Sequence, residues 1–375
     1  MAGIYIHIPF CKQACHYCNF HFSTNRGLQA PMLATIAQEL RMRRGYMQGE
    51  RITSIYLGGG TPSLLEVAAL DKLLVQVAQL FVLAADVEVT LEANPDDLHL
   101  VKLKELKAVG INRLSIGIQT FQDDLLRYLH RIHDSQQATA SVRGARQAGF
   151  DNLTIDLIYG IPAQSPTRWE ADLTKALSLQ PDHIAAYCLT IEPKTVLGHW
   201  QRKGKLIPVV EEVAARQFET LVETLEAGGY EHYEISNFSR PSHAARHNTN
   251  YWKQGHYLGV GPGAHSYNGQ TRQYNVRHNQ QYINGIRQGI IPCTVEVLHR
   301  KDHINEYIMT RLRTKWGCDL AWLQSQYGYD WQQEQRVYID QLMAQQLVRL
   351  ENNHLFLTKK GKLLADEITA ALFVV

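Results

Sequence analysis

The sequence has almost no net charge. Its 375 residues include 38 Lys and Arg against 36 Asp and Glu, which leaves a formal charge of +2. Proteins that bind nucleic acids or anionic membranes through bulk charge carry a marked basic excess. We therefore expect no nucleic-acid partner, and any ligand must be recognised by a local site.

Long hydrophobic runs are also absent. No apolar stretch approaches the roughly 20 residues that cross a bilayer, so we expect no membrane span. The first residues, MAGIYIHIPFCKQ, show neither a basic leader before a long apolar stretch nor a small-residue cleavage site. The sequence therefore predicts a cytoplasmic protein, in which clustered cysteines indicate metal or redox chemistry rather than disulfides.

Short β-branched runs alternate with amphipathic stretches over the first half of the chain. This alternation predicts an α/β fold of parallel strands joined by right-handed helical crossovers. Six repeats favour an open, partial (β/α)6 barrel of the TIM type over a closed barrel of eight strands. The expected strands are 3–8, 52–57, 87–91, 113–118, 152–157 and 183–188, and the expected helices are 30–44, 64–80, 97–108, 135–148, 166–179 and 212–227.

The pattern changes after the barrel repeats. Residues 236–298 are rich in aromatics, His, Asn and Gly and include the stretch HNTNYW, which favours a linker or a site-building region. Residues 299–375 turn helical and contain a short strand-like run before a last helix, as in a compact winged-helix-like domain. We therefore expect a barrel over 1–235, a linker over 236–298 and a mainly helical domain over 299–375, whose mixed charge does not require DNA binding.

Three of the six cysteines fall within eight residues. Cys11, Cys15 and Cys18 follow the spacing C-x3-C-x2-C after the first predicted strand, on one loop at the mouth of the barrel. A closed zinc site needs four ligands, which His16 and His21 could complete, whereas electron-transfer clusters normally take four cysteines. Three thiolates alone favour a 4Fe-4S cluster with one iron open to a chelating ligand, and zinc is the alternative.

Polar residues also follow later strands. The turn LGGGTPS after the second strand offers close backbone approach and free amide donors to a ligand. Glu92, Gln119 and Asp156 each stand where an apolar run stops, so each should face the mouth of the barrel. One such residue alone is explained equally well as a helix cap or turn former. Together, above a cysteine loop, they predict a polar cup for a nucleoside.

These motifs resemble the radical S-adenosylmethionine superfamily, which shares the C-x3-C-x2-C loop, the GGGTP turn and the partial barrel. Within it, IYIHIPFC, YLGGGTPS, LEANP, RLSIGIQTF, LHRIH and IDLIYGIP resemble the branch that contains oxygen-independent coproporphyrinogen III oxidase and the HemW heme chaperones. The resemblance runs through nearly the whole chain. It implies that S-adenosylmethionine completes the cluster and is contacted by Tyr5, Tyr17, Gly59, Gly60, Thr61, Glu92, Gln119, Arg131 and Asp156.

Two departures separate the chain from the oxidase. The oxidase resembles C-x3-C-x2-C-x-C, whereas Phe20 stands at the position of its last cysteine, and the first predicted strand begins almost at Met1 without a long leading segment. The stretch HNTNYW is instead similar to the HNxxYW signature of the heme chaperones. The resemblance therefore implies a chaperone that binds heme and passes it to an acceptor hemoprotein.

His247 is the expected heme-binding residue, because a neutral imidazole is a good axial ligand and the adjoining Tyr251 and Trp252 offer flat apolar faces. A local structural role for this stretch stays open. The histidines that compete for the same role are His243, His256 and His265.

Two other functions remain open. One is an oxidase-like radical enzyme that acts on a tetrapyrrole, with the difficult chemistry residing in the cofactor. The other is a zinc-stapled interaction scaffold. For the chaperone, the cluster and S-adenosylmethionine would serve as a structural or regulatory switch, with a cofactor-dependent homodimer and an electron donor as further expected partners.

Overall fold

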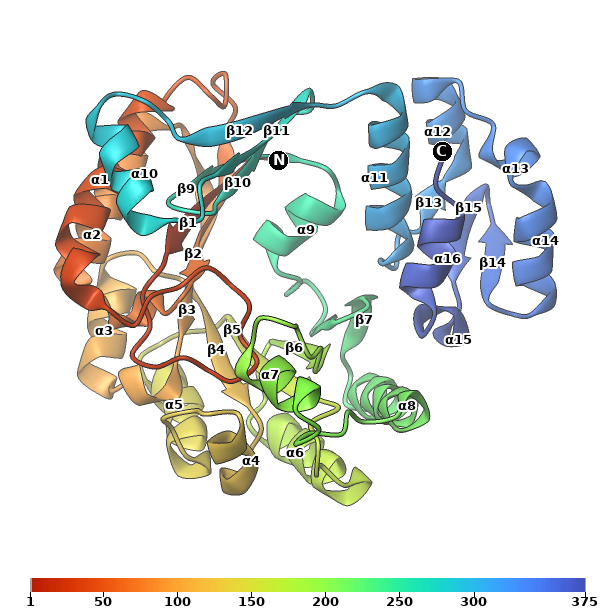
Figure 1. Ribbon diagram of the computed structural model, residues 1–375, viewed down its shortest axis with the longest axis horizontal. Helices are drawn as coiled ribbons and strands as arrows, with labels where there is room; N and C mark the ends of the chain where they lie inside the picture. Colours follow the sequence, from red (N-terminus) through yellow and green to blue (C-terminus); the bar gives the residue numbers. More distant parts are fainter. Residues whose placement is uncertain (1, 375) are drawn as a thin grey trace.

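The structure is a computed structural model that describes residues 2–374, and one curved sheet of twelve strands dominates it (Figure 1). Its strand order is β12-β11-β10-β9-β1-β2-β3-β4-β5-β6-β8-β7, and β1 to β6 run parallel to one another. No hydrogen bonds join the two end strands, so the partial barrel is open, as predicted. The six parallel strands are β1 (Ala2–Ile8), β2 (Ile52–Gly59), β3 (Leu83–Ala93), β4 (Arg113–Gln119), β5 (Leu153–Tyr159) and β6 (His183–Cys188).

Helices cover the outer face of this sheet (Figure 1). Ile4, Ile6 and Ile8 of β1 are fully buried in the core that they share with Met32 and Ile36 of the first helix, whereas the alternate residues of β1 face the inside of the barrel. The long crossover helices lie within a few residues of the predicted ranges. They are α1 (Gln29–Met42), α2 (Val67–Leu80), α3 (Leu100–Ala108), α5 (Ser135–Gln147), α6 (Pro166–Ser178) and α8 (Glu211–Ala227).

Short helical segments that the sequence patterns did not predict lie in the connections at the carboxyl ends of the strands. They include α4 (Asp123–Tyr128), α7 (Val196–Arg202) and the 3-10 turns Arg26–Leu28, Pro62–Leu64 and Pro95–Asp97.

The segment after α8 continues the same sheet. Strands β7 (Glu231–Glu234) and β8 (Asn237–Ser239) extend it beyond β6, and β9 (His256–Val260) pairs in parallel with β1. Between them, α9 (Arg246–Trp252) packs against β1 and β2 on the inner side of the curved sheet (Figure 1). The predicted division at residues 235 and 298 stays a prediction. The remaining elements of this segment are β10 (His265–Tyr267), β11 (Thr271–Asn275), α10 (Asn279–Arg287) and β12 (Cys293–Val297).

The C-terminal region has its own core and a small sheet of order β13-β15-β14, which agrees with the predicted helical, winged-helix-like fold. It contacts the barrel through Arg313, whose guanidinium lies 3.0 Å from the buried Glu234 carboxylate. No helix among residues 2–374 is both long and apolar enough to cross a membrane. The elements are α11 (Arg300–Leu312), β13 (Cys318–Asp319), α12 (Leu320–Tyr327), α13 (Trp331–Glu334), α14 (Arg336–Ala344), β14 (Val348–Glu351), β15 (His354–Leu357), α15 (Lys359–Lys362) and α16 (Ala365–Ala371).

Candidate functional site

The inner face of the curved sheet lines a cavity of ≈ 850 Å³. This volume lies within the range of about 300–1,000 Å³ that is usual for small-molecule sites. The cavity extends from the cysteine loop after β1 to the buried Arg113 and His183 further down the barrel. His247 is the one predicted site residue that does not line it. Those that do are Tyr5, Cys11, Cys15, Tyr17, Cys18, Gly59, Gly60, Thr61, Glu92, Gln119, Arg131 and Asp156.

The three predicted cluster cysteines are half-buried free thiols at the edge of this cavity. The Thr61 hydroxyl donates to Cys11 Sγ at 3.5 Å, and Arg131 Nη1 donates to Cys15 Sγ at 3.5 Å. Burial raises the pKa of Cys11 and raises that of Cys18 to about 11. Bound iron would deprotonate such thiols outright, so this set of sulfur donors fits an iron-sulfur cluster. Among residues 2–374, no three His, Cys, Asp or Glu side chains form a group that could hold a single metal ion.

The glycines at the end of β2 leave room for two neighbouring side chains. The Glu92 carboxylate accepts hydrogen bonds from the Tyr56 hydroxyl at 2.8 Å and from the Gly59 amide at 3.0 Å. A Cβ on Gly58 would lie 2.8 Å from Glu92 Oε1. Gly59 has φ +104°, and a Cβ there would lie 2.3 Å from the His7 ring. Two of these glycines are therefore required by close packing, which the sequence alone could not establish.

Two carboxyl groups and one guanidinium form the polar cup. Burial raises the pKa of Glu92, and burial together with the Glu92 charge raises the pKa of Asp156 to about 7. Asp156 accepts a hydrogen bond from Ser115 Oγ at 3.1 Å. The guanidinium of the cup is held by Asn94, because Arg131 Nη2 donates to Asn94 Oδ1 at 2.6 Å. Carboxylates held beside each other in this way accept hydrogen bonds well from ligand hydroxyl or ammonium groups. The cup can therefore take the polar parts of a nucleoside or an amino acid.

His247 lies behind the cavity wall. Its ring is 1% exposed, with Nδ1 hydrogen-bonded to Ser54 Oγ at 2.9 Å and Nε2 to the Tyr251 hydroxyl at 2.9 Å. The ring also stacks on Tyr56 at a centroid distance of 5.1 Å, and burial lowers its pKa to about 3. Both ring nitrogens are therefore engaged, while Asn248 and Tyr251 of the same helix do line the cavity. Iron ligation by His247 stays a prediction.

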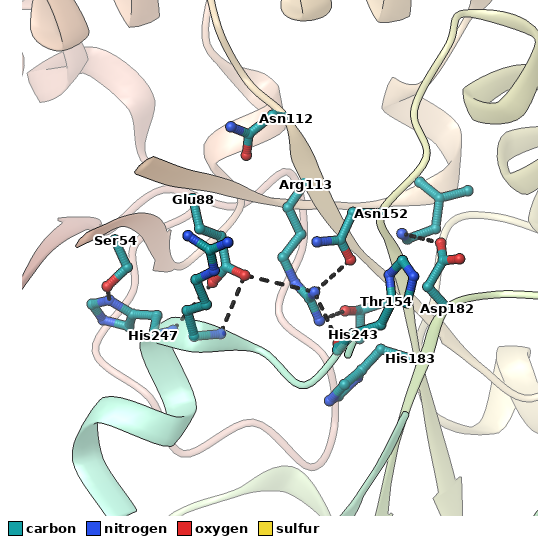
Figure 2. Close-up of polar contacts among 12 residues, drawn as sticks. Ser54, Glu88, Asn112, Arg113, Asn152, Thr154, Asp182, His183, His243 and His247 are labelled. Carbon is teal, nitrogen blue, oxygen red and sulfur yellow. Dashed lines mark hydrogen bonds and ion pairs between the residues drawn. The ribbon is translucent and has the colours of Figure 1, made fainter. Parts of the chain in front are cut away.

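A buried ion pair holds this helix inside the barrel (Figure 2). Glu88 of β3 accepts hydrogen bonds from the backbone amides of Arg246 and His247 at 3.2 and 3.1 Å, and Figure 2 shows its carboxylate facing Arg113 of β4. Arg113 Nη1 lies 3.8 Å from Glu88 and donates to Asn152 Oδ1 at 2.5 Å. Sequence reasoning missed both residues. A charged residue at an inward position of a barrel strand was the available signal.

Comparison with known proteins assigns the family. Residues 5–176 match the model of the radical SAM superfamily, and residues 298–364 match that of the HemN C-terminal domain. A protein named heme chaperone HemW from Bacillus subtilis is 36% identical over 99% of both chains. The chain belongs to the HemW family of radical SAM proteins. An Escherichia coli protein of the same name is 38% identical over 70% of this chain and 69% of its own.

The fold is shared with a solved relative. Coproporphyrinogen III oxidase (HemN) from Escherichia coli superposes with a TM-score of 0.87 at 24% identity, over 100% of this chain and 90% of the other. The radical SAM superfamily implies a 4Fe-4S cluster and S-adenosylmethionine for this chain. The thiol loop, the glycine turn and the polar cup all border one cavity, which fits that pair of groups.

Proposed function

We propose that this chain is a heme chaperone, which binds heme in the barrel cavity and passes it to an acceptor hemoprotein. The observation that carries the proposal is similarity to proteins named heme chaperone HemW over 99% of the chain. An open cavity with aromatic residues at its edge supports it. Phe20 is 74% exposed and borders the cavity, at the position where the oxidase pattern has a further cysteine.

We further propose that the three clustered thiols hold the 4Fe-4S cluster, which supplies an iron that S-adenosylmethionine completes. Arg131 would then balance the charge of the Cys15 thiolate through the hydrogen bond that it already makes. Glu92 and Asp156 would accept hydrogen bonds from the nucleoside and amino-acid groups, with Tyr5, Tyr17 and Gln119 lining the same space. A cofactor-dependent homodimer and an electron donor stay predictions, and gel filtration with and without S-adenosylmethionine tests the first.

The cluster assignment is tested by anaerobic reconstitution followed by iron and sulfide analysis. We expect about four iron atoms per chain, and their loss in Cys15→Ser. Cys293→Ser is the matched control, because Cys293 is also a half-buried free thiol but stands on β12, outside the residues that line the cavity. Equal iron content in the two variants would rule out the assignment to Cys15.

The chaperone function is tested by titrating the reconstituted protein with heme and following absorbance. Saturable binding and transfer of the heme to an apo-hemoprotein are expected, and absence of saturable binding would end the proposal. Oxidase-like radical chemistry is the alternative. Formation of protoporphyrinogen from coproporphyrinogen III, under reducing anaerobic conditions with S-adenosylmethionine, would favour that alternative.

A further inference from the structure

The four histidines that the sequence offers as heme ligands have different surroundings. His247 is buried with both ring nitrogens hydrogen-bonded. His256 pairs through Nδ1 with the Glu50 carboxylate, and neither His243 nor His256 lines the cavity. His265, on β10, does line it. His265 is therefore the one of the four that faces the space in which heme would be bound.

The His265 ring is held in place but has free nitrogens. It stacks on Tyr274 of the paired strand β11 at a centroid distance of 5.6 Å and an interplanar angle of 29°. Among residues 2–374, no hydrogen bond engages either ring nitrogen. Burial and the guanidiniums of Arg277 and Arg272 lower the pKa of His265, so the imidazole is neutral near pH 7. A neutral, oriented imidazole with an available lone pair is the form that binds heme iron.

Other histidines that line the cavity are less available. His7 is hydrogen-bonded through both nitrogens, to the Tyr5 hydroxyl at 3.0 Å and to the His21 carbonyl at 2.9 Å. His21 uses Nε2 with Asn279 Oδ1 at 2.8 Å, which leaves one nitrogen. His183 is 1% exposed deep in the barrel, with Nε2 bonded to a tyrosine hydroxyl at 2.7 Å. Its other ring nitrogen, Nδ1, has no hydrogen-bond partner within the described part of the chain but is buried.

An unpaired guanidinium lies on the same side of the cavity. Arg277 follows β11, lines the cavity and takes part in none of the ion pairs or hydrogen bonds found among residues 2–374. Gly263 makes room for it, because a Cβ there would lie 3.2 Å from Arg277 Cγ. The neighbouring Arg272, by contrast, is already paired with Glu306. A free guanidinium beside an open cavity is suited to bind a carboxylate in bidentate fashion.

We propose that the bound heme lies at the mouth of the cavity, with its iron ligated by His265 and one propionate paired with Arg277. This inference rests on the proposed heme-chaperone function and names the groups that perform it. Phe20 and Tyr187, which are 74% and 46% exposed, both line the cavity and would supply flat faces for the macrocycle. His247 then acts as a positioning residue that fixes the cavity wall.

Heme titration of the full-length, anaerobically reconstituted protein tests the inference. Loss of an axial imidazole changes the spin state of heme iron, so His265→Ala should shift the Soret band and the electron paramagnetic resonance signal. Added imidazole should restore both signals, which also shows that the variant is folded. His265→Met should give the spectrum of a thioether ligand. Arg277→Ala should keep the wild-type spectrum and weaken binding by about three- to tenfold.

His256→Ala is the comparison variant and should keep the wild-type spectrum and affinity. His247→Ala should keep the imidazole signature but bind heme more weakly, because His247 holds Tyr56 and Tyr251 in place. A wild-type spectrum in His265→Ala, or loss of the imidazole signature in His247→Ala or His21→Ala instead, would overturn the assignment while leaving the chaperone function standing. Absence of saturable heme binding in the wild-type protein would refute the function itself. The two failures are therefore distinguishable.

Discussion

Removing the Glu88 carboxylate should release the α9 helix from the barrel. Glu88 is 5% exposed and accepts from the two backbone amides that begin α9, and its ion-pair partner Arg113 is 1% exposed. The change Glu88→Ala therefore leaves two helix amides without an acceptor and one buried guanidinium without its counter-charge. Burial makes both losses expensive, because water cannot replace the carboxylate.

The expected cost follows from these contacts. Hydrogen bonds to a charged group contribute about 1.5–3 kcal/mol each, and breaking a buried ion pair costs about 3–5 kcal/mol. Arg113 keeps its hydrogen bonds to Asn152 and Thr154, and its 3.8 Å separation from Glu88 is long, so the contributions do not add fully. We expect Glu88→Ala to lower the free energy of unfolding by about 3–5 kcal/mol, and Glu88→Gln by about 1–2 kcal/mol because one amide keeps its acceptor.

Urea denaturation followed by circular dichroism measures these changes. Glu231→Ala is the control, since Glu231 forms an exposed pair with Lys315 at 2.6 Å that should contribute less than about 1 kcal/mol. Glu88→Ala should also weaken heme binding, because Asn248 and Tyr251 on α9 line the cavity. A loss no larger than that of the control would refute the view that this buried pair anchors the helix.

Two further predictions concern the polar cup. Burial raises the pKa of Asp156 from the ordinary 3.8 to about 7 in the folded protein. Between these two pH values the folded state keeps a proton that the unfolded chain has released. The free energy of unfolding therefore falls as the pH rises from about 4 to about 7. Asp156→Asn should therefore raise the melting temperature of the cofactor-free protein more at pH 8 than at pH 5. The same change should weaken S-adenosylmethionine binding. An equal rise in melting temperature at both pH values would contradict the burial argument. Gly59→Ala should abolish S-adenosylmethionine binding in equilibrium dialysis, because the added Cβ would overlap the His7 ring. Gly49→Ala is the control and should bind normally, because Gly49 also has a positive φ but has open space around it. Binding by Gly59→Ala would show that the backbone at this position adapts.

The strands and helices of the barrel were predictable because each is enclosed by the next layer. Each strand must present apolar residues to the core at every second position, as Leu153, Ile155 and Leu157 of β5 do, so such strands stand out in the sequence. Strands near the open edge carry no such requirement. In β12 the residues Thr294 to Val297 are exposed, and the two alternating valines, Val295 and Val297, are too few to mark a strand. The segment therefore reads locally as a linker although it forms ladder hydrogen bonds with β11.

Residues of the candidate site were predictable where position in the barrel alone places them. Glu92 lies near the carboxyl end of β3 and Asp156 lies on β5, which is separated from β3 only by β4, and both side chains line the cavity. The surroundings of His247 were not predictable, because its partner Ser54 is 193 residues away in the chain. The sequence shows a histidine beside aromatic residues, and only the fold reveals that both of its nitrogens are engaged.

The contacts of His247 give the HNTNYW stretch a physical role that needs no iron. Tyr56 donates to Glu92 in the nucleoside cup, and the Tyr56 ring stacks on His247. His247 in turn binds the Tyr251 hydroxyl, and Tyr251 lines the cavity. A ligand that takes over the Glu92 hydrogen bond therefore acts on a chain of contacts that runs from Tyr56 on β2 through His247 to Tyr251 on α9. This arrangement allows S-adenosylmethionine to influence heme binding through packing, and the His247→Ala arm of the heme titration, run with and without S-adenosylmethionine, measures that influence.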